Sequence, residues 1–394
     1  MKFIKTPVKG MCDMLPSDMR LREHVLGMIK ETYGRYGFMQ IETPVMEHIE
    51  NLTSKQGGDN EKLIFKVMKR GADLQRAIEK GDGEYADNGL RYDLTVPLAR
   101  YYANNREKLP TPFKAMQLGN VWRADNPQKG RFRQFTQCDI DILGDDSSLA
   151  EIELITATAS MLSQIFAEIG VTDFTVHIND RQILGAVALA AGFSEEDIGS
   201  VLISLDKFDK IGLDGIRNDL LQGGYSEETV DRYLAVYRTV KEGVGIEEFC
   251  AAIPQEVLPA RVSENLAEII ACVRPMLCPG VKIVFDPTLV RGMGYYTGPI
   301  FEVTIDGYNF SIGFERIVTI LKDHMQGSMQ LQNASAYLIG NRVSRERKAE
   351  VIAKAMELRR AGEIVTVLPM SKNVGHQIEL LEAEGFTKFE KIYE

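Results

Sequence analysis

The sequence predicts an α+β fold with a mainly helical insertion and a small C-terminal α/β domain. Short segments in which polar and apolar residues alternate indicate strands that expose one face. Residues 183–275 show helical spacing without strand alternation. Residues 336–393 alternate between strand and helix patterns in the order βαβαβ, which favours a small, mostly parallel sheet.

The elements follow one another in a clear order. Residues 17–34 predict an amphipathic helix, and the segment FMQIETP predicts a strand after it. Residues 61–90 are polar and indicate an exposed hairpin or loop. Residues 148–170 predict a second helix that ends at Gly170. We therefore predict four segments: a core in two parts (1–182 and 279–330), a mainly helical insertion (183–278) and a C-terminal α/β domain (331–394).

Composition excludes several classes of protein. Apolar residues make up 44% and charged residues 26% of the 394 positions, as in ordinary globular proteins. The net charge of −10 argues against a protein that coats nucleic acid nonspecifically. The chain contains no apolar run of membrane-spanning length, and its first residues do not resemble a signal peptide, so we expect a cytoplasmic location. The sequence has neither a GxGxxG motif nor a P-loop.

Cysteine and histidine spacing gives no indication of a metal site. The five cysteines are odd in number and scattered, so we expect reduced thiols and no structural zinc. The five histidines form no ligand pair at helical spacing. His177 falls on the polar side of the alternating segment DFTVHIND, where we expect it at the surface. We predict no metal site built from protein ligands.

Residues 118–144 carry the most unusual polar pattern. The segment predicts a hairpin whose stem holds Arg123 on one strand, with Gln137, Asp139 and Asp141 on one face of the other. Its loop is basic, with Gln128, Lys129, Arg131 and Arg133. Guanidinium groups bind phosphates with paired hydrogen bonds, and carboxylates accept from an ammonium or an imidazole. Such a pocket suits a zwitterion that is joined to a nucleotide phosphate, but a surface hairpin with neutralised charges fits the pattern equally well.

Several motifs, in order along the chain, resemble those of histidyl-tRNA synthetases, which are class II aminoacyl-tRNA synthetases. VWRAD with NPQKGRFRQFTQCDIDILG resembles motif 2, LVRGMGYYTG resembles the histidine-specific signature, and GFERIVTIL resembles motif 3. KGMCDMLP, YGFMQIETPVME and LRYDLTVPLARY also match, and INDRQIL and LDKFDKIG resemble the insertion region. The resemblance implies a class II core with an antiparallel sheet, and a C-terminal domain that resembles an anticodon-binding domain.

The resemblance also implies a role for individual residues. The catalytic arginines would be Arg123, Arg291 and Arg316. Histidine would be bound by Asp93, Thr95, Gln137, Asp141, Tyr295 and Tyr296. ATP, entering with Mg²⁺ as a substrate complex and not as a tightly held cofactor, would meet Arg123, Asp125, Arg133 and Arg316. The tRNA acceptor end would meet Gln128 and Lys129. Asp93 also has a purely structural alternative, as the cap of a helix that begins near residue 96.

The sequence departs from the family pattern at three places. Asp125 stands where the family usually has glutamate, and Gly294 stands where aspartate is common. Between Phe310 and Gly313 the chain lacks the family's longer stretch with its GGRYD element. Two explanations stay open: the protein lacks the element, or the printed sequence omits a loop of this kind.

Two functions remain in competition at this point. The first is a homodimeric histidine–tRNA ligase whose partners are tRNA(His), histidine and ATP, with the dimer formed through the motif 1 resemblance in YGFMQIETPVME. The second is a non-catalytic paralogue, such as the regulatory subunit of ATP phosphoribosyltransferase, which binds histidine as a signal. Arg123, Arg316 and the βαβαβ tail favour the enzyme, whereas the missing GGRYD element favours the paralogue.

Overall fold

The computed structural model describes residues 3–53, 60–126, 132–239, 243–290, 296–305, 313–325, 331 and 333–394. The chain divides into two compact units. One unit comprises Val8–Met11 and Met28–Arg316, and the other comprises Met1–Pro7, Cys12–Gly27 and Ile317–Glu394. The mixture of helices and strands confirms the α+β prediction, whereas the division into four segments stays a prediction.

The larger unit holds the sheet that carries the unusual polar segment. In this sheet β1 (Met39–Ile41) pairs in parallel with β5 (Phe113–Trp122), and β5 pairs antiparallel with β6 (Gln134–Leu143). Helix α1 (Pro16–Arg35) is joined to α5 (Ser148–Ala167) by the hydrogen bond that Thr32 Oγ1 donates to Gln164 Oε1 at 3.2 Å. Helix α5 in turn packs against β6.

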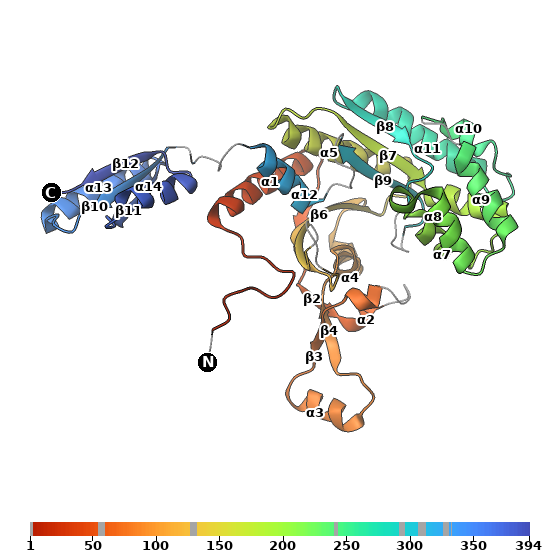
Figure 1. Cartoon of the computed structure of the whole chain (residues 1–394), viewed down its shortest axis with the longest axis horizontal. Helices are drawn as coiled ribbons and strands as arrows, with labels where there is room; N and C mark the ends of the chain where they lie inside the picture. Colours follow the sequence, from red (N-terminus) through yellow and green to blue (C-terminus); the bar gives the residue numbers. More distant parts are fainter. Residues whose placement is uncertain are drawn as a thin grey trace. The chain divides into compact units, whose positions relative to one another are not determined.

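A second sheet has the strand order β8-β7-β9 (Figure 1). The central strand β7 (Phe174–Asp180) is parallel to β8 (Val281–Phe285) and antiparallel to β9 (Pro299–Ile305). Phe174, Val176 and Ile178 are buried, and α11 (Ala260–Val273) packs against β7 and β8. The alternation of DFTVHIND therefore places one apolar face against helices and leaves one polar face.

The predicted helical stretch consists of successive helices. They are α6 (Arg181–Ala191), α7 (Ile198–Leu205), α8 (Phe208–Gln222), α9 (Glu227–Thr239), α10 (Ile246–Cys250) and α11. Aromatic side chains form part of their core, because the ring of Phe193 meets Tyr225 and Tyr233 edge-on at 5.1 and 5.6 Å. Asp180 begins the stretch, since its carboxylate accepts the backbone N–H of Gln182 at 2.7 Å and caps α6.

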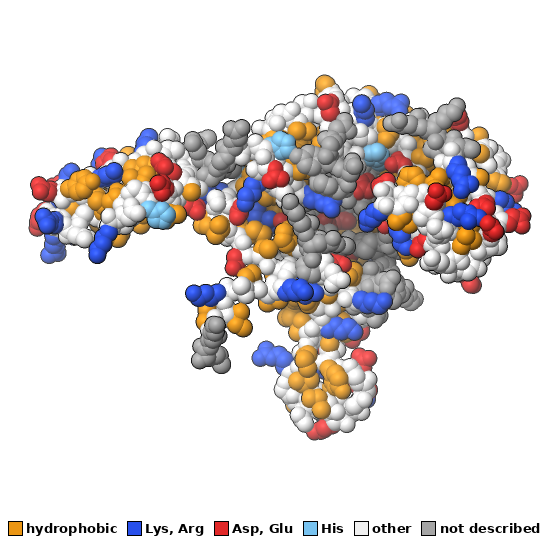
Figure 2. Space-filling model, in the orientation of Figure 1, with side chains coloured by type: hydrophobic (Ala, Val, Ile, Leu, Met, Phe, Trp, Pro, Cys, Tyr) orange, Lys and Arg blue, Asp and Glu red, His pale blue; other side chains and the backbone are white. Residues whose placement is uncertain are grey.

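The polar segment 61–90 forms a hairpin, one of the two forms that the sequence predicts, with a helix inserted between its strands. Strands β2 (Met46–His48), β4 (Ala86–Leu90) and β3 (Lys66–Met68) form an antiparallel sheet, and α3 (Gly71–Lys80) lies between β3 and β4. Gly81 ends α3 in the left-handed conformation that glycine favours, with φ of 66°. Hydrophobic side chains are exposed near α3, including Met68, Ile78 and Tyr85 (Figure 2).

Shorter elements connect these parts. They are α2 (Ile49–Thr53), η1 (Asn60–Leu63), α4 (Thr95–Asn105), η2 (Arg106–Lys108), η3 (Arg274–Met276) and α12 (Phe314–His324). All five cysteines are free thiols. Among the described residues, no helix combines the length and the apolar character needed to cross a membrane.

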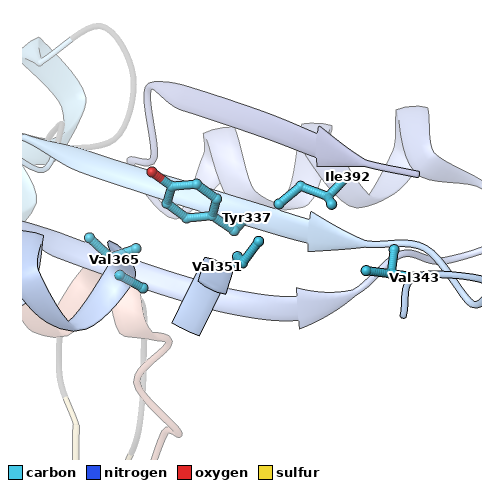
Figure 3. Packing of buried hydrophobic residues seen from close by; sticks show 6 residues of the cluster. Tyr337, Val343, Val351, Val365 and Ile392 are labelled. Carbon is cyan, nitrogen blue, oxygen red and sulfur yellow. The ribbon is translucent and has the colours of Figure 1, made fainter. Parts of the chain in front are cut away.

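The C-terminal strands pair in parallel in the order β11-β10-β12, as the βαβαβ pattern predicts. The elements are β10 (Ala334–Ile339), α13 (Arg345–Arg360), β11 (Ile364–Pro369), α14 (Val374–Ala383) and β12 (Lys388–Ile392). Tyr337, Val351 and Ile392 belong to one buried cluster that joins α13 to the sheet (Figure 3). This cluster shows that the C-terminal segment has apolar packing of its own.

Candidate active site

Strands β5 and β6 form the frame of the candidate site. Their antiparallel register places Gln137 opposite Gly119, Asp139 opposite Gln117, and Asp141 opposite Ala115. Because side chains alternate along a strand, Gln137, Asp139 and Asp141 share one face, as the sequence pattern predicts. The segment before α4 brings Asp93 into electrostatic range of Asp139 and Asp141. The structure thus gathers side chains from positions far apart in the sequence.

The two carboxylate oxygens of Asp93 have different environments, which bear on the two alternatives that the sequence presents. Its Oδ1 atom accepts the backbone N–H of Val96 at 3.1 Å, so the side chain stabilises the start of α4. Its Oδ2 atom is buried without a hydrogen-bond partner. Asp93 is only 1% exposed, so water does not readily satisfy this oxygen. One oxygen therefore serves the fold, and the other is available to a ligand.

The same lack of partners recurs on β6. Gln137 Oε1 and Asp141 Oδ2 are buried, and neither has a hydrogen-bond partner among the residues that the structure describes. A buried acceptor without a donor costs about 1–3 kcal/mol, so such groups are rare in native proteins. These atoms, with Asp93 Oδ2, are all acceptors, and a ligand that satisfies them must bring donors. An ammonium or an imidazole N–H meets this requirement.

The carboxyl groups of the pocket are difficult to ionise. Burial, together with the neighbouring Asp141 and Asp93 carboxylates, raises the pKa of Asp139 to about 7. Burial and the charge of Asp93 raise the pKa of Asp141 to about 6. Burial also raises the pKa of Asp93, although the Val96 N–H and Arg123 act in the opposite direction. Titratable groups with shifts of this kind cluster at functional sites, and here they favour a cationic ligand.

The carboxylate cluster lacks the character of a metal site. Across the described ranges, no group of three or more His, Cys, Asp or Glu side chains is placed to hold a metal ion. The positive charge that the pocket requires therefore fits an organic cation better than a metal held directly by these carboxylates.

Arg123 stands beside this cluster immediately after β5. Its Nε donates to the Tyr92 carbonyl at 2.9 Å, and its guanidinium lies 5.1 Å from the centre of the Phe135 ring. Within the described residues, its terminal nitrogens Nη1 and Nη2 make no hydrogen bond. The backbone contact and the ring orient the group, which leaves donors available for an anion such as a phosphate.

Gly119 provides room for a second arginine next to the pocket. A Cβ atom at Gly119 would lie 2.3 Å from Nη2 of Arg91, so this position requires glycine while the arginine keeps its place. Arg91 is buried, and its Nη1 donates to the Thr43 carbonyl at 2.7 Å. Its contacts indicate that Arg91 supports the backbone around β5.

Arg133 and Asp125 connect the two ends of the hairpin loop. The Nε atom of Arg133 donates to the Asp125 carbonyl at 3.0 Å, and the Arg133 N–H donates to the Gly10 carbonyl at 2.7 Å. The second bond brings Gly10 to the base of the hairpin. Gln128 and Lys129 fall outside the described residues, so their predicted contact with tRNA stays a prediction.

Helix α12 begins against the first residues of β6. The Glu315 side chain accepts the backbone N–H of Thr136 at 2.9 Å, which joins GFER to the polar strand. Arg316 is the next residue and lies in the first turn of α12. The two segments that resemble motifs 2 and 3 therefore meet, and Arg316 lies one residue from that contact.

The structure describes only some of the remaining predicted residues. Thr95 is exposed at the start of α4, two residues after Asp93. Tyr296 is 37% exposed and precedes β9. Arg291 and Tyr295 fall outside the described residues, as does the segment 306–312 where the sequence departs from the family pattern.

Sequence reasoning assigned no role to Asp139 or Glu315. For Asp139 a local signal existed, because it lies between Gln137 and Asp141 on the same face. For Glu315 the partner is 179 residues away in sequence, so spacing alone gives no indication of the contact.

Known proteins share the sequence and the fold of this chain. The family model for histidyl-tRNA synthetase matches residues 10–313. A histidine–tRNA ligase of Leifsonia xyli subsp. xyli is 40% identical over 420 aligned positions, which cover 98% of this chain and 94% of that protein. A probable histidine–tRNA ligase of Tropheryma whipplei strain Twist is 37% identical, covering 97% of this chain and 94% of that protein.

Two solved structures resemble the chain in three dimensions. The histidyl-tRNA synthetase from Nostoc sp. PCC 7120 has a TM-score of 0.74 and 25% identity, covering 98% of this chain and 90% of that one. An ATP phosphoribosyltransferase regulatory subunit/histidyl-tRNA synthetase from Bacillus halodurans C has the same TM-score at 20% identity, with full coverage of both chains, and indicates the fold alone. On the family match and the identity to the Leifsonia protein, this chain belongs to the histidyl-tRNA synthetase family.

Proposed function

We propose that this protein is a histidine–tRNA ligase that activates histidine with ATP and transfers it to tRNA(His). The observation that carries the proposal is 40% identity to a histidine–tRNA ligase over 98% of the chain. The pocket of Asp93, Gln137 and Asp141 supports it, because its buried acceptors lack the donors that histidine would bring. Arg123 beside them supplies donors for the phosphate of the second substrate.

Histidine would bind by its two nitrogen-containing groups. Asp93, Thr95 and Gln137 would accept from the α-ammonium group. Asp141, with Tyr295 and Tyr296, would orient the imidazole. Burial makes each hydrogen bond to a charged group stronger than it would be in water. The excess of carboxylates over guanidinium groups in the described pocket suits the positive charge of the amino acid.

ATP would be held by arginines. Arg123 would bind the α-phosphate, with Asp125 and Arg133 ordering the hairpin loop around the nucleotide. Arg316 would bind the far phosphates, and Arg291 would neutralise charge on the reacting phosphate. Magnesium would enter with ATP as part of the substrate complex and offset phosphate charge. The histidine carboxylate is itself the nucleophile, so positioning and charge stabilisation provide the acceleration.

The transfer step would use the hairpin loop. Gln128 and Lys129 would contact the acceptor end of tRNA(His), whose terminal ribose hydroxyl attacks the carbonyl of histidyl-adenylate. The bond to the phosphate breaks, AMP leaves, and an ester to the tRNA forms.

The proposal includes an architecture. We propose a class II core with an antiparallel sheet built around β5, β6, β7 and β9, since both β5–β6 and β7–β9 pair antiparallel. We also propose a homodimer through the segment YGFMQIETPVME, and an anticodon-binding role for the segment 331–394. The cytoplasmic location stays a prediction from the sequence.

Histidine-dependent exchange of labelled pyrophosphate into ATP tests the enzymatic function. A ligase carries out this exchange, because histidyl-adenylate forms reversibly. A regulatory paralogue binds histidine without exchange. Binding without exchange under saturating ATP and magnesium would therefore replace the ligase with the regulatory alternative.

A further inference from the structure

Asp139 and Gln137 are linked within the candidate site. The Nε2 atom of Gln137 donates to Oδ1 and Oδ2 of Asp139 at 3.5 and 3.4 Å. These bonds are long, but they fix which end of the amide faces Asp139. The opposite end, Oε1, is buried and has no partner. Asp139 therefore determines that the amide presents an acceptor to the pocket.

The surroundings of Asp139 couple this arrangement to protonation. Among the described residues, the titratable groups in electrostatic contact with it are Asp141 on the same strand, Asp93 before α4, Arg123 after β5, and Tyr33 on α1. Two of these are carboxylates that oppose ionisation of Asp139, and only the guanidinium favours it. Burial and the two carboxylates raise the pKa of Asp139 to about 7.

We propose that Asp139 is a positioning residue for histidine: as a carboxylate it holds the Gln137 amide with Oε1 toward the α-ammonium group, and as an acid it no longer fixes that orientation. The proposal rests on the histidine site proposed above. Asp139 itself would not touch the substrate and would act through Gln137.

The physical reason lies in the donors and acceptors of each state. An ionised Asp139 has only acceptors, so the amide turns its N–H₂ toward it. A protonated Asp139 keeps an acceptor and gains an O–H donor, so the amide is also satisfied when it turns Oε1 toward the acid. The N–H₂ group would then face the incoming ammonium, where two donors meet and binding weakens. Bound ammonium also favours ionised Asp139, so histidine binding releases a proton near neutral pH.

Calorimetry of histidine binding without ATP tests the proposal. Titrations in two buffers of different ionisation enthalpy count the protons released, and a pH series gives the affinity. The parallel probe is β-(1,2,4-triazol-3-yl)alanine, whose ring does not titrate near neutral pH, so substrate titration is separated from that of the protein. For the wild type we expect proton release near pH 7, and an affinity that falls about tenfold per pH unit below it.

Three variants make the test specific. In Asp139→Asn, the side chain cannot ionise and, like the protonated acid, offers both a donor and an acceptor, so we expect weaker binding of the triazole probe at neutral pH and loss of the pH dependence near pH 7. In Asp139→Ala the amide is released, and we expect KM for histidine to rise about fivefold to tenfold with little change in kcat. Asp146→Asn, at an exposed aspartate beyond β6, is the matched control and should retain the wild-type pH profile.

The outcomes separate the two proposals. Wild-type pH dependence and proton release in Asp139→Asn, alongside normal pyrophosphate exchange, would overturn the role of Asp139 and leave the ligase function intact. Wild-type affinity in Asp139→Ala would do the same. A wild-type protein that binds neither histidine nor the triazole probe at any pH would overturn both.

Discussion

The polar faces of β6 and β7 look alike in sequence but differ in how their side chains are satisfied. On β7, His177 Nδ1 bonds to Asp286 Oδ2 at 3.1 Å, and His177 Nε2 bonds to Thr304 Oγ1 at 2.8 Å. The other Asp286 oxygen accepts from Thr288 Oγ1 at 2.7 Å. On β6, Gln137 and Asp141 each retain a buried oxygen without a partner. The polar groups named on β7 have hydrogen-bond partners within the protein, whereas those on β6 leave acceptors for a ligand.

The carboxyl groups on the two faces respond in opposite directions. Burial alone would raise the pKa of Asp286, but hydrogen bonds from His177 and Thr288 outweigh it and lower the value. Burial and like charges raise the pKa of Asp139 to about 7. A binding face is thus distinguished from a structural one by incomplete hydrogen bonding and not by its number of polar residues.

The largest effect that we expect is on catalysis, at Arg123. Arg123→Ala should lower the rate of histidyl-adenylate formation by about a hundredfold to a thousandfold, the usual loss for one preorganised charge contact. Arg123→Lys should restore part of the rate, because lysine lacks the paired donors. Single-turnover adenylation measures both, and Arg35→Ala on α1 is an exposed control. Adenylation within threefold of wild type in Arg123→Ala would remove Arg123 from the site.

Next in size is the effect of Asp141→Asn on histidine recognition. We expect KM for histidine to rise about tenfold to a hundredfold, because a hydrogen bond to a charged group contributes about 1.5–3 kcal/mol. The ligand-free variant should have a higher melting temperature than the wild type near neutral pH, because the substitution removes a carboxylate whose ionisation is disfavoured by burial. The same change at a satisfied position, Asp286→Asn, should lower the melting temperature and leave KM unchanged. If both variants behaved alike, the contrast between the two faces would have no functional meaning.

A smaller effect is expected on the polar face of β7. His177→Ala leaves Asp286 and Thr304 each without one partner, and all three groups lie near the surface, where water replaces much of what is lost. We expect the free energy of unfolding to fall by about 1–2 kcal/mol, with adenylation unchanged. Denaturant titration and pyrophosphate exchange measure the two quantities. A large loss of exchange in a folded His177→Ala protein would show that β7 also serves the reaction.

The smallest effect concerns stability and pH. An acid whose pKa is raised by folding binds more protons in the native state, so stability falls as pH rises through the interval between the unfolded and folded values. For Asp139 this interval runs from 3.8 to about 7. We expect the ligand-free Asp139→Asn variant to gain on the order of 1 kcal/mol over wild type at neutral pH, and to lose this advantage in acid. An advantage that is independent of pH would contradict the shifted pKa.

Local patterns predicted the elements and the polar face of β6. The period of two residues places Gln137, Asp139 and Asp141 together without knowledge of any distant segment. The tail was predicted for the same reason, since βαβαβ leaves few ways to pair three strands. The segment 61–90 was predicted as a hairpin or loop, and β3 and β4 do pair as a hairpin, but the polar composition gave no indication of α3, whose single buried residue is Ala77.

The sequence patterns did not predict contacts between segments that are far apart in the chain. His177 was expected at the surface and its side chain is 26% exposed, but its partners Asp286 and Thr304 come 109 and 127 residues later, so spacing did not predict these hydrogen bonds. The different environments of the two Asp93 oxygens also could not be predicted from spacing. Only the fold shows that one oxygen accepts a hydrogen bond from α4 and the other does not. The family resemblance named most site residues, but it did not indicate which of their donors and acceptors have hydrogen-bond partners within the protein.

The hydrogen bond between the Glu315 side chain and the Thr136 N–H has a consequence for the order in which the nascent chain folds. Its partners are 179 residues apart, and a ribosome adds about 5–20 residues per second, so roughly 10–40 s separate their synthesis. During that interval β6 can pair with β5 while the start of α12 does not yet exist. A chain released early, before Phe314, would carry the carboxylates of the pocket without Arg316. Such a fragment would lack one of the arginines proposed to bind ATP, so we expect no adenylation from unfinished translation products.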